Sequence, residues 1–372
     1  MLGKPISCIL FLILLTSTVV ALNTNPVSSQ STITVPDDYP TIQEAINNAN
    51  EGDTIFVKRA TYYENVVVNR TILLIGEERE TTIIDARGIG ITIELTVDGV
   101  LVSNFTISYG EHGIHSTSSH NHIIRNNIIR KNTNGATGNY YTGTIYENNI
   151  VKENTYGLNF GHLSGPSSIN NTAKNNEIYD NTVAGVYVSA AYGKNTLVGN
   201  NIHDNGIGIV LDHTENNNVI GNSIRNNNKA GGYMYGIYMR NAVQNNISTN
   251  LFQYNNVGIH FENSNNNEIC HNNFVGNGKQ EDGASLNIWD DGSKGNYWSN
   301  YLTKYPDAVA NLTSGTWNTP YAVDGDNIDH YPLVNQAEIP EFSSFVTSTL
   351  FMMLILAVSI FKHKQRLLKS KK

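Results

Sequence analysis

Residues 195–205 read Asn-Thr-Leu-Val-Gly-Asn-Asn-Ile-His-Asp-Asn, and the same pattern returns at 217–227, 245–255 and 267–277. Each copy has the form Asn-x-Φ-x-x-Asn-x-Φ-x-x-Asn, in which Φ is an apolar residue. The middle Asn of each copy gives a series spaced by 22 to 28 residues: Asn104, Asn127, Asn149, Asn176, Asn200, Asn222, Asn250 and Asn272. Self-similarity at a period of this length predicts a solenoid in which each repeat forms one turn.

The pattern within one repeat predicts short β-strands. Apolar residues stand two after one Asn and three before the next, and they do not recur at the helical spacing of i, i+3, i+4 and i+7. Most repeats continue to a Gly and a further alternating segment, at 157–160, 185–188, 208–211, 236–239 and 258–261. We therefore expect rungs of three strands that stack in parallel at about 4.8 Å. Three columns of Asn at the bends should bond to their copies in adjacent rungs.

Three pieces of the sequence resemble the NosD-type right-handed parallel β-helix proteins. This is a carbohydrate-binding and sugar-hydrolase group of the pectate-lyase-like superfamily, common on archaeal cell surfaces. The pieces are the Asn-x-Ile-x-x-Asn rung, the entry segment 35–57, and an exit segment made of 295–301, 320–321 and 324–332. The resemblance covers residues 33–334 and implies an all-β fold, a right-handed parallel β-helix solenoid. Ala60 stands where such entry segments usually carry Gly, which implies a slightly altered turn.

The two ends of the chain have features of an exported, membrane-anchored protein. Residues 1–21 contain a Lys followed by a short apolar core, which predicts a secretory signal peptide; an uncleaved anchor is the alternative. Residues 345–361 carry no charge and precede a basic tail at 362–372. This predicts a single-pass transmembrane helix with the tail in the cytoplasm and the repeats outside the cell. A buried core helix is the alternative, and Pro340-Glu-Phe342 resembles a short archaeal sorting signal.

Between these ends we expect a polar linker at 22–34, the β-helix at 35–334 and a second linker at 335–344. Residues 40–49 predict a short helix with a Pro at its start, a Thr cap and one apolar face, formed by Ile42, Ala45, Ile46 and Ala49. Because a solenoid needs its open core covered at the ends, this helix is expected to cap the first rung.

Composition limits the partners of this chain. Charged residues make up only 15% of the sequence and the net charge is −8, so no nucleic-acid partner is expected. Once the signal peptide is removed, Cys270 is the only cysteine, which excludes an intrachain disulfide. Acceptor sequons Asn-x-Ser/Thr fit an exported chain and occur at Asn69, Asn104, Asn170, Asn246 and Asn311. Asn104 falls in a predicted Asn column and is expected to be inaccessible.

The Gly-containing strand carries the candidate binding residues at its outward positions. One outward column is predicted to contain His115, Asn159, Tyr187, Val210, Tyr238 and His260, and the next Ser189, Asp212, Arg240 and Glu262. Rings beside charged groups suit a sugar chain, because apolar sugar faces stack on rings while hydroxyls bond to charged groups. An ordinary solvated sheet face is the alternative. The candidate carbohydrate-binding residues are Tyr187, Tyr238, His260, Asp212 and Arg240.

Catalysis would need carboxylates and a base on the same face. The resemblance implies that lyases of the superfamily use acidic ligands for Ca²⁺ and an Arg or Lys base, and the candidates here are Asp212, Arg240 and Glu262. A second acidic column could space its carboxylates as glycosidases require. However, it stands at a bend, where Asp is favoured for turn reasons. That second column is Glu153, Asp180 and Asp204.

One loop carries the residues of a candidate metal site. Asp324, Asp326 and Asp329 supply oxygen donors at short spacing, as a Ca²⁺ site would, although the loop lacks the distal Glu of an EF-hand. The loop lies in the exit segment, so a structural role in closing the last rung is the alternative. Copper ligation is not indicated, because His120 and His122 form the closest pair of histidines and Met is scarce.

These features predict a cell-surface β-helix protein, held in the cell membrane by its C-terminal helix, that binds or scaffolds extracellular carbohydrate without catalysis. A Ca²⁺-dependent polysaccharide lyase or a glycoside hydrolase is one alternative. A structural envelope protein or a NosD-like transporter-accessory protein is another.

Overall fold

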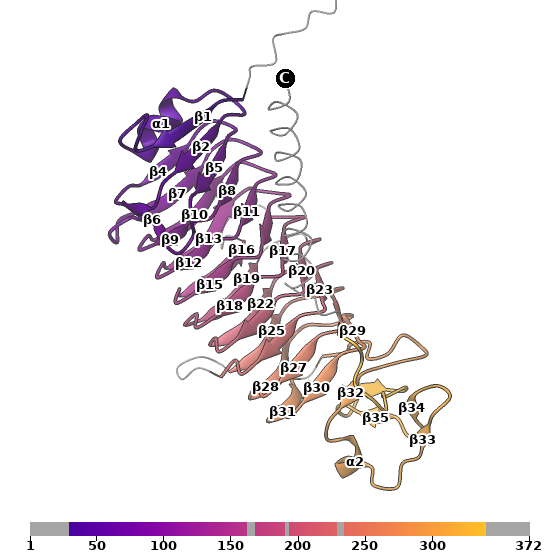
Figure 1. Cartoon of the computed structure of the whole chain (residues 1–372). Helices are drawn as coiled ribbons and strands as arrows, with labels where there is room; N and C mark the ends of the chain where they lie inside the picture. Colours follow the sequence, from indigo (N-terminus) through magenta and orange to yellow (C-terminus); the bar gives the residue numbers. More distant parts are fainter. Residues whose placement is uncertain (1–29, 162–167, 190–192, 229–233, 284, 340–372) are drawn as a thin grey trace, which may run out of the picture. The chain divides into compact units, whose positions relative to one another are not determined.

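The computed structural model describes residues 30–161, 168–189, 193–228, 234–283 and 285–339. Three parallel β-sheets run through these residues, and each repeat contributes one strand to each sheet, which confirms the predicted parallel β-helix (Figure 1). The predicted signal peptide at 1–21, transmembrane helix at 345–361 and basic tail at 362–372 lie outside the described residues. Within the described segments, no helix has the length and apolar character that a membrane crossing needs.

The sheets are named A, B and C, and their strands are given in the order of pairing. Sheet A contains β1 (Thr32–Val35), β2 (Thr54–Val57), β5 (Leu73–Gly76), β8 (Leu101–Ser103), β11 (Ile123–Arg125), β14 (Ile145–Glu147), β17 (Thr172–Lys174), β20 (Thr196–Val198), β23 (Asn218–Ile220), β26 (Asn246–Ser248) and β29 (Glu268–Cys270). Sheet B contains β3 (Ala60–Tyr62), β6 (Thr82–Asp85), β9 (Thr106–Ser108), β12 (Ile128–Arg130), β15 (Ile150–Lys152), β18 (Glu177–Tyr179), β21 (Asn201–His203), β24 (Ser223–Arg225), β27 (Leu251–Gln253), β30 (Asn273–Val275) and β32 (Tyr297–Trp298). Sheet C contains β4 (Val66–Val68), β7 (Ile91–Leu95), β10 (His112–Thr117), β13 (Asn134–Asn139), β16 (Tyr156–Phe160), β19 (Ala184–Ser189), β22 (Ile207–Asp212), β25 (Tyr235–Arg240), β28 (Val257–Glu262) and β31 (Lys279–Asp282).

Stacked columns of apolar side chains form the core. In sheet B the inward residues of successive rungs stand opposite one another in the register Ile202, Ile224, Phe252 and Phe274, and all four are fully buried. The rings of Phe252 and Phe274 stack with their centroids 4.9 Å apart. Because equivalent residues meet in adjacent rungs, one apolar position in the repeat becomes a continuous buried column.

Three buried ladders of Asn stand at the bends, as predicted. Asn200 is representative: its Nδ2 and its backbone N–H both donate to Oδ1 of Asn222, each at 2.9 Å. The Nδ2 group also donates to the carbonyl of Ala173 at 2.9 Å. Each amide thus satisfies a backbone N–H that the bend removes from the sheet. The ladder between sheets A and B contains Asn127, Asn149, Asn176, Asn200, Asn222, Asn250, Asn272 and Asn296.

The prediction that Asn104 belongs to this ladder is wrong. The register places Phe105, not Asn104, opposite Asn127, and the N–H of Phe105 donates to Oδ1 of Asn127 at 3.0 Å. Asn104 precedes the ladder position and has a φ of 64°. Two adjacent positions of the bend favour Asn for different reasons, since one needs an amide ladder and the other a left-handed backbone.

The N-terminal cap is the predicted helix, α1 (Ile42–Asn48). Thr41 caps it by accepting the N–H of Glu44 at 3.1 Å, and the predicted apolar face is buried. The solenoid begins three residues earlier than predicted, however, because residues 32–34 pair with β2 as part of β1 and are not a linker. The alternating Thr-Ile-Thr-Val of this strand was the missed signal.

The C-terminal end of the solenoid is closed by irregular structure, here called the C-terminal cap (residues 299–339). The predicted β-helix range of 35–334 therefore takes in most of this cap, whose described strands do not add to the three sheets. Within the cap, Tyr321 stacks on Trp298 with centroids 4.3 Å apart, and Trp298 stacks on the core residue Phe274 at 4.6 Å. These rings cover the open end of the core. The cap contains α2 (Tyr301–Lys304) and two antiparallel pairs, β33 (Ala310–Asn311) with β34 (Thr316–Trp317) and β35 (Tyr321–Ala322) with β36 (Ile328–Asp329).

Candidate functional site

The outward face of sheet C gathers most of the candidate residues. The register confirms the predicted column from Asn159 through Tyr187, Val210 and Tyr238 to His260. The prediction missed one rung, because Thr137 is the residue opposite His115. The second predicted column is confirmed as well, since Asp212 stands between Ser189 and Arg240, and Arg240 opposite Glu262. Side chains from strands far apart in sequence therefore share one surface.

A second ring-bearing column on this sheet was not predicted. It occupies the first position of the sheet C strands, directly before the Gly, and it includes His112, Tyr156 and Tyr235. Tyr156 lies 5.5 Å from Tyr187 between ring centroids, edge to face, and Tyr235 stacks on His260 at 4.5 Å. The signal was present in the sequence as an aromatic residue before several of the repeated Gly residues.

An apolar base supports these rings. Ile207 and Val210 are only 3% exposed, although they belong to the outward columns. They form a small cluster with Ala184, separate from the main core, on which the Tyr side chains of both columns pack. Burial against this base fixes the rings on the surface.

A hollow of about 360 Å³ lies on the same face, here called the sheet C hollow. Rings of His112 and His115 line it together with Tyr156 and Tyr187, and amides, hydroxyls and a Gly line the rest. A Cβ on Gly161 would lie 2.2 Å from the carbonyl oxygen of Ser189, so a larger residue cannot stand there. Of the predicted carbohydrate-binding residues, only Tyr187 lines the hollow. Its other lining residues are Asn134, Thr137, Asn139, Asn159, Gly161 and Ser189.

Asp212 is the centre of a hydrogen-bonded network. Arg240 donates to it through Nε at 2.8 Å and through a terminal nitrogen at 2.6 Å, and the Tyr187 hydroxyl donates at 2.9 Å. His213 Nδ1 lies 2.6 Å from Oδ1 of Asp212, the oxygen that also accepts from Arg240 Nε. Burial opposes ionisation of Asp212, but these hydrogen bonds outweigh it and lower its pKa. The carboxylate is thus held ionised and oriented, which suits a structural anchor better than a proton donor.

Glu262, the third catalytic candidate, has a different partner. The hydroxyl of Tyr238 donates to its carboxylate. Partial burial and this contact with Glu262 raise the pKa of Tyr238 to about 12. Of the three catalytic candidates, Asp212 and Arg240 are therefore paired with each other. Glu262 lies two rungs from Asp212 and is bonded to Tyr238 instead.

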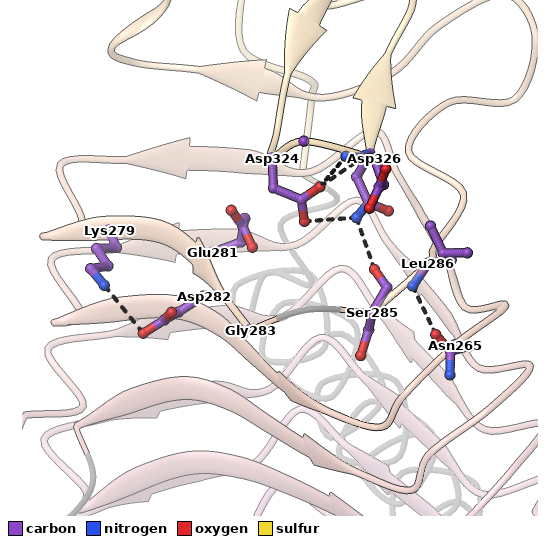
Figure 2. Close-up of a pocket in the computed structure, with 11 residues that line it drawn as sticks. Asn265, Lys279, Glu281, Asp282, Gly283, Ser285, Leu286, Asp324 and Asp326 are labelled. Carbon is purple, nitrogen blue, oxygen red and sulfur yellow. Dashed lines mark hydrogen bonds and ion pairs between the residues drawn. The ribbon is translucent and has the colours of Figure 1, made fainter.

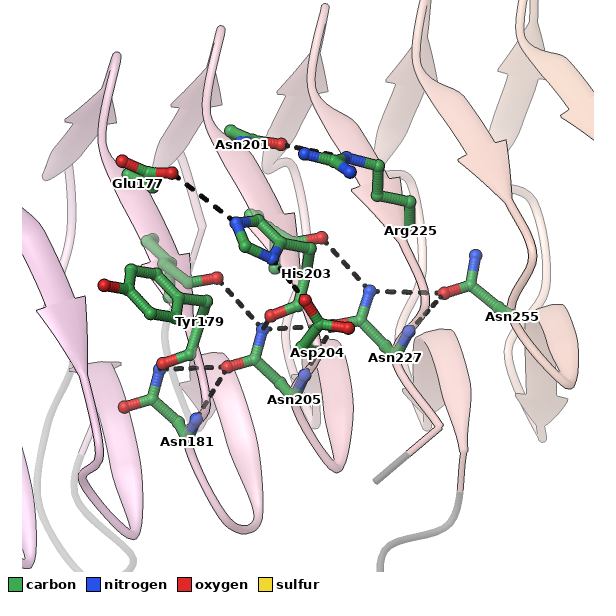
Figure 3. Close-up of polar contacts among 12 residues, drawn as sticks. Glu177, Tyr179, Asn181, Asn201, His203, Asp204, Asn205, Arg225, Asn227 and Asn255 are labelled. Carbon is green, nitrogen blue, oxygen red and sulfur yellow. Dashed lines mark hydrogen bonds and ion pairs between the residues drawn. The ribbon is translucent and has the colours of Figure 1, made fainter. Parts of the chain in front are cut away.

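The second acidic column lies at the bend between sheets B and C. Glu153, Asp180 and Asp204 all have φ values between 55° and 57°, so they occupy left-handed turn positions. Figure 3 shows the carboxylate of Asp204 turned toward His203, whose Nδ1 lies 2.7 Å away. The Asn ladder at this bend runs beside them and includes Asn181, Asn205, Asn227 and Asn255. The ring of His203 stacks on Tyr179 at 5.1 Å. Turn geometry accounts for the backbone of this column, in line with the alternative stated for it.

The three residues of the candidate Ca²⁺ site have separate roles. Asp324 accepts the N–H groups of Asp326 and Asn327 at 2.8 and 2.9 Å, beside a hollow of about 700 Å³ (Figure 2). Asp329 is buried and accepts the indole N–H of Trp298 and the N–H of Asn296, each at 2.8 Å. Burial raises the pKa of Asp329 to about 7. Within the described residues, no three His, Cys, Asp or Glu side chains are grouped as a metal site would require.

The family model described as "Periplasmic copper-binding protein (NosD)" matches residues 46–234 and 224–303. The chain belongs to the NosD family. It is 32% identical over 307 residues to a cell surface glycoprotein of Methanothermus fervidus, a match that covers 76% of this chain and 50% of that relative. The chain thus spans about half the length of this relative.

Comparison with solved structures gives matches of low similarity to this NosD-family chain. ORF18 of Geobacillus virus E2 has a TM-score of 0.48 and 14% identity, with 70% of this chain and 60% of that chain covered. The A-module of the mannuronan C-5 epimerase AlgE6 from Azotobacter vinelandii has a TM-score of 0.41 and 17% identity, with 66% and 94% covered.

The copper in the NosD family description does not fit the described residues of this chain. The rings of His112 and His115 stack at an interplanar angle of 21°, so their in-plane lone pairs do not converge on one point. His122 is fully buried, and its Nε2 lies 3.0 Å from the Ser119 hydroxyl, so the ring is shielded from solvent. Burial also raises the pKa of the Cys270 thiol to about 12, far from the thiolate that a soft metal binds.

Proposed function

We propose that this chain is a cell-surface β-helix protein that binds a carbohydrate chain on the outward face of sheet C without cleaving it. The observation that carries the proposal is the sheet C hollow, in which rings stand at both ends and amides and hydroxyls stand between them. Rings offer flat apolar surfaces to sugar faces, while the polar groups offer hydrogen bonds to sugar hydroxyls.

The repeat supports an extended ligand. The hollow spans the four rungs that contain β10, β13, β16 and β19, and rings continue on β25 and β28. Rungs stack at about 4.8 Å, so the face offers similar groups at regular intervals along the solenoid axis. A polymer that lies along this axis would meet several such groups at once, which strengthens binding through multivalency.

The charges favour a neutral carbohydrate. None of the ten described residues that line the hollow is Asp, Glu, Lys or Arg. The guanidinium of Arg240 is already paired with Asp212, and Glu262 and Asp282 lie further along the face. An acidic polymer would need cations that are not already paired. We therefore expect uncharged polymers to bind better than uronate polymers.

The location outside the cell rests on the ends of the sequence. The apolar segment in residues 1–21 fits export, and the uncharged run at 345–361 with its basic tail fits a membrane anchor. The similarity to a protein named a cell surface glycoprotein supports the same location.

Affinity electrophoresis of the protein in gels that contain neutral or acidic polysaccharides tests this proposal. Retardation by a neutral polymer is expected, and Tyr156→Ala should weaken it by about tenfold, or about 1.4 kcal/mol, through loss of one stacked ring. Tyr187→Phe keeps the ring and should retain binding. Tyr254→Ala, an exposed Tyr on the bend between sheets B and C, is the matched control.

The same samples distinguish the alternatives. The protein is incubated with each polysaccharide in the presence of Ca²⁺ or of a chelator, and the products are analysed by mass spectrometry. Shortened or unsaturated oligosaccharides would replace the binding function with an enzymatic one. Absence of retardation by every polymer would leave a structural role for the face and refute the proposal.

A further inference from the structure

The five acceptor sequons lie in very different surroundings. Transfer of a glycan to Asn requires that the amide and the hydroxyl two residues later both be reached by the transferase. Side-chain exposure and hydrogen bonding therefore decide which sequons can be used in the folded protein. The five are Asn69, Asn104, Asn170, Asn246 and Asn311.

Asn311 meets both requirements. It lies at the end of β33, and all three residues of its sequon, Asn311, Leu312 and Thr313, are exposed. Its Oδ1 accepts the N–H of Thr313 at 3.1 Å and that of Ser314 at 3.3 Å. Because the amide oxygen takes these bonds, the side chain is held in one orientation in an exposed hairpin turn. Leu312 is 85% exposed, so no described residue covers its side chain.

Asn104 and Asn246 are obstructed. The residues after Asn104, Phe105 and Thr106, are buried, and the Thr106 hydroxyl donates to the carbonyl of Arg79 at 2.6 Å. Asn246 lies in β26, which is paired on both sides by β23 and β29, and its Nδ2 donates to Asn218 at 3.4 Å. A transferase could not draw the Asn104 sequon out of the core, or the Asn246 sequon out of the sheet, without breaking these contacts.

Each of the remaining two sequons has a backbone N–H or a hydroxyl that is already hydrogen-bonded. Asn170 is exposed, but the next residue, Asn171, is buried in the Asn ladder at the bend before sheet A, where its N–H donates to Asn195 Oδ1 at 3.0 Å. Asn69 is exposed, but the Thr71 hydroxyl donates to the carbonyl of Asp98 at 3.0 Å. Each therefore lacks one of the features that Asn311 combines.

We infer that Asn311 is an N-glycosylation site. The co-reactant is an oligosaccharide carried on a polyprenyl phosphate. The amide nitrogen of Asn311 forms a bond to the anomeric carbon, the bond from that carbon to the phosphate oxygen breaks, and its electron pair leaves with the phosphate. The amide loses one proton to a base of the transferase. Asn311 lies in the C-terminal cap, so its glycan would leave the sheet C hollow open.

The inference rests on the proposed cell-surface location and is tested with the full chain, expressed in a host that exports it and has N-linked glycosylation. Protein from the membrane fraction is digested, and the mass of each sequon peptide is measured. The Asn311 peptide should carry a glycan in most copies, and the Asn104 and Asn246 peptides should be unmodified. Thr313→Ala should abolish the modification, while Thr313→Ser should retain it; Thr313 is exposed, so neither change threatens the fold.

Three results would overturn the inference, and they are distinguishable. An unmodified Asn311 in protein recovered from the membrane fraction refutes the glycosylation site alone. Protein that stays in the cytosol with Asn311 unmodified refutes both the site and the proposed location. Glycans on Asn104 or Asn246 with Asn311 bare would refute the argument from accessibility.

Discussion

The Asn ladder allows a sharp comparison between two adjacent residues of the same type. Asn200 is 1% exposed and belongs to the ladder between sheets A and B, while Asn201 is half-buried and points away from the core. Replacing each by Ala removes the same atoms from the same rung. The two variants therefore differ only in what those atoms contact.

The cost of Asn200→Ala follows from its bonds. Its Oδ1 accepts the buried N–H of Asn176 at 3.0 Å and the Asn176 Nδ2 at 2.9 Å, and its own Nδ2 donates to Asn222 and to Ala173. The variant leaves one buried backbone donor without a partner and removes the amide contacts above and below. We expect a loss of about 2–5 kcal/mol in the free energy of unfolding. Asn201→Ala removes only a 3.4 Å contact from Arg225 and should cost about 0.5 kcal/mol or less.

Urea unfolding followed by circular dichroism measures both values by linear extrapolation. Asn200→Leu serves as a further variant, because Leu fills a similar volume but offers no hydrogen bonds. It should be about as costly as Asn200→Ala. Equal stabilities of the Asn200→Ala and Asn201→Ala variants, or full recovery of stability by Leu, would refute the argument that the amide ladder holds the bends.

Three further predictions use buried ionisable groups. Arg240→Ala leaves the Asp212 carboxylate, which is 4% exposed, without its main partner. Because Arg240 itself is partly exposed, the free energy of unfolding measured in urea should fall by only about 1–3 kcal/mol. Adding Asp212→Asn should recover part of this loss. The pKa of Asp329 is about 7 in the folded protein against an ordinary value of 3.8, so its contribution favours folding at low pH and is lost as the pH rises from about 4 to 7. The free energy of unfolding of Asp329→Asn should therefore change less between about pH 4 and 7 than that of the parent protein. The same change with pH in both proteins would contradict this prediction. The Cys270 thiol, with a pKa of about 12, should resist alkylation at pH 8 until urea is added, as peptide mass spectrometry would show; rapid labelling without urea would contradict its burial.

The amino-acid sequence alone predicted the parts of the fold that repeat. The spacing of Asn and apolar residues predicted the parallel strands, the ladders and the inward columns, because each rung carries the same local pattern and stacks on its copy. The capping helix was predicted for a similar reason, since its Thr cap, the Pro before that cap and its apolar face are all local. Where two local causes favour the same residue, as at Asn104, the sequence could not separate them.

Only the tertiary structure decided how the site is built. Tyr156 and Tyr187 are 31 positions apart in the sequence, and the stacking of β16 on β19 brings their rings to 5.5 Å. The pairing of Asp212 with Arg240 likewise depends on the stacking of adjacent rungs. The exposure of Asn311 depends on how the C-terminal cap folds. A repeat determines which face a side chain occupies, because that depends on alternation along one strand. Which side chains then touch depends on insertions between rungs and on burial, and these are settled only when the rungs stack.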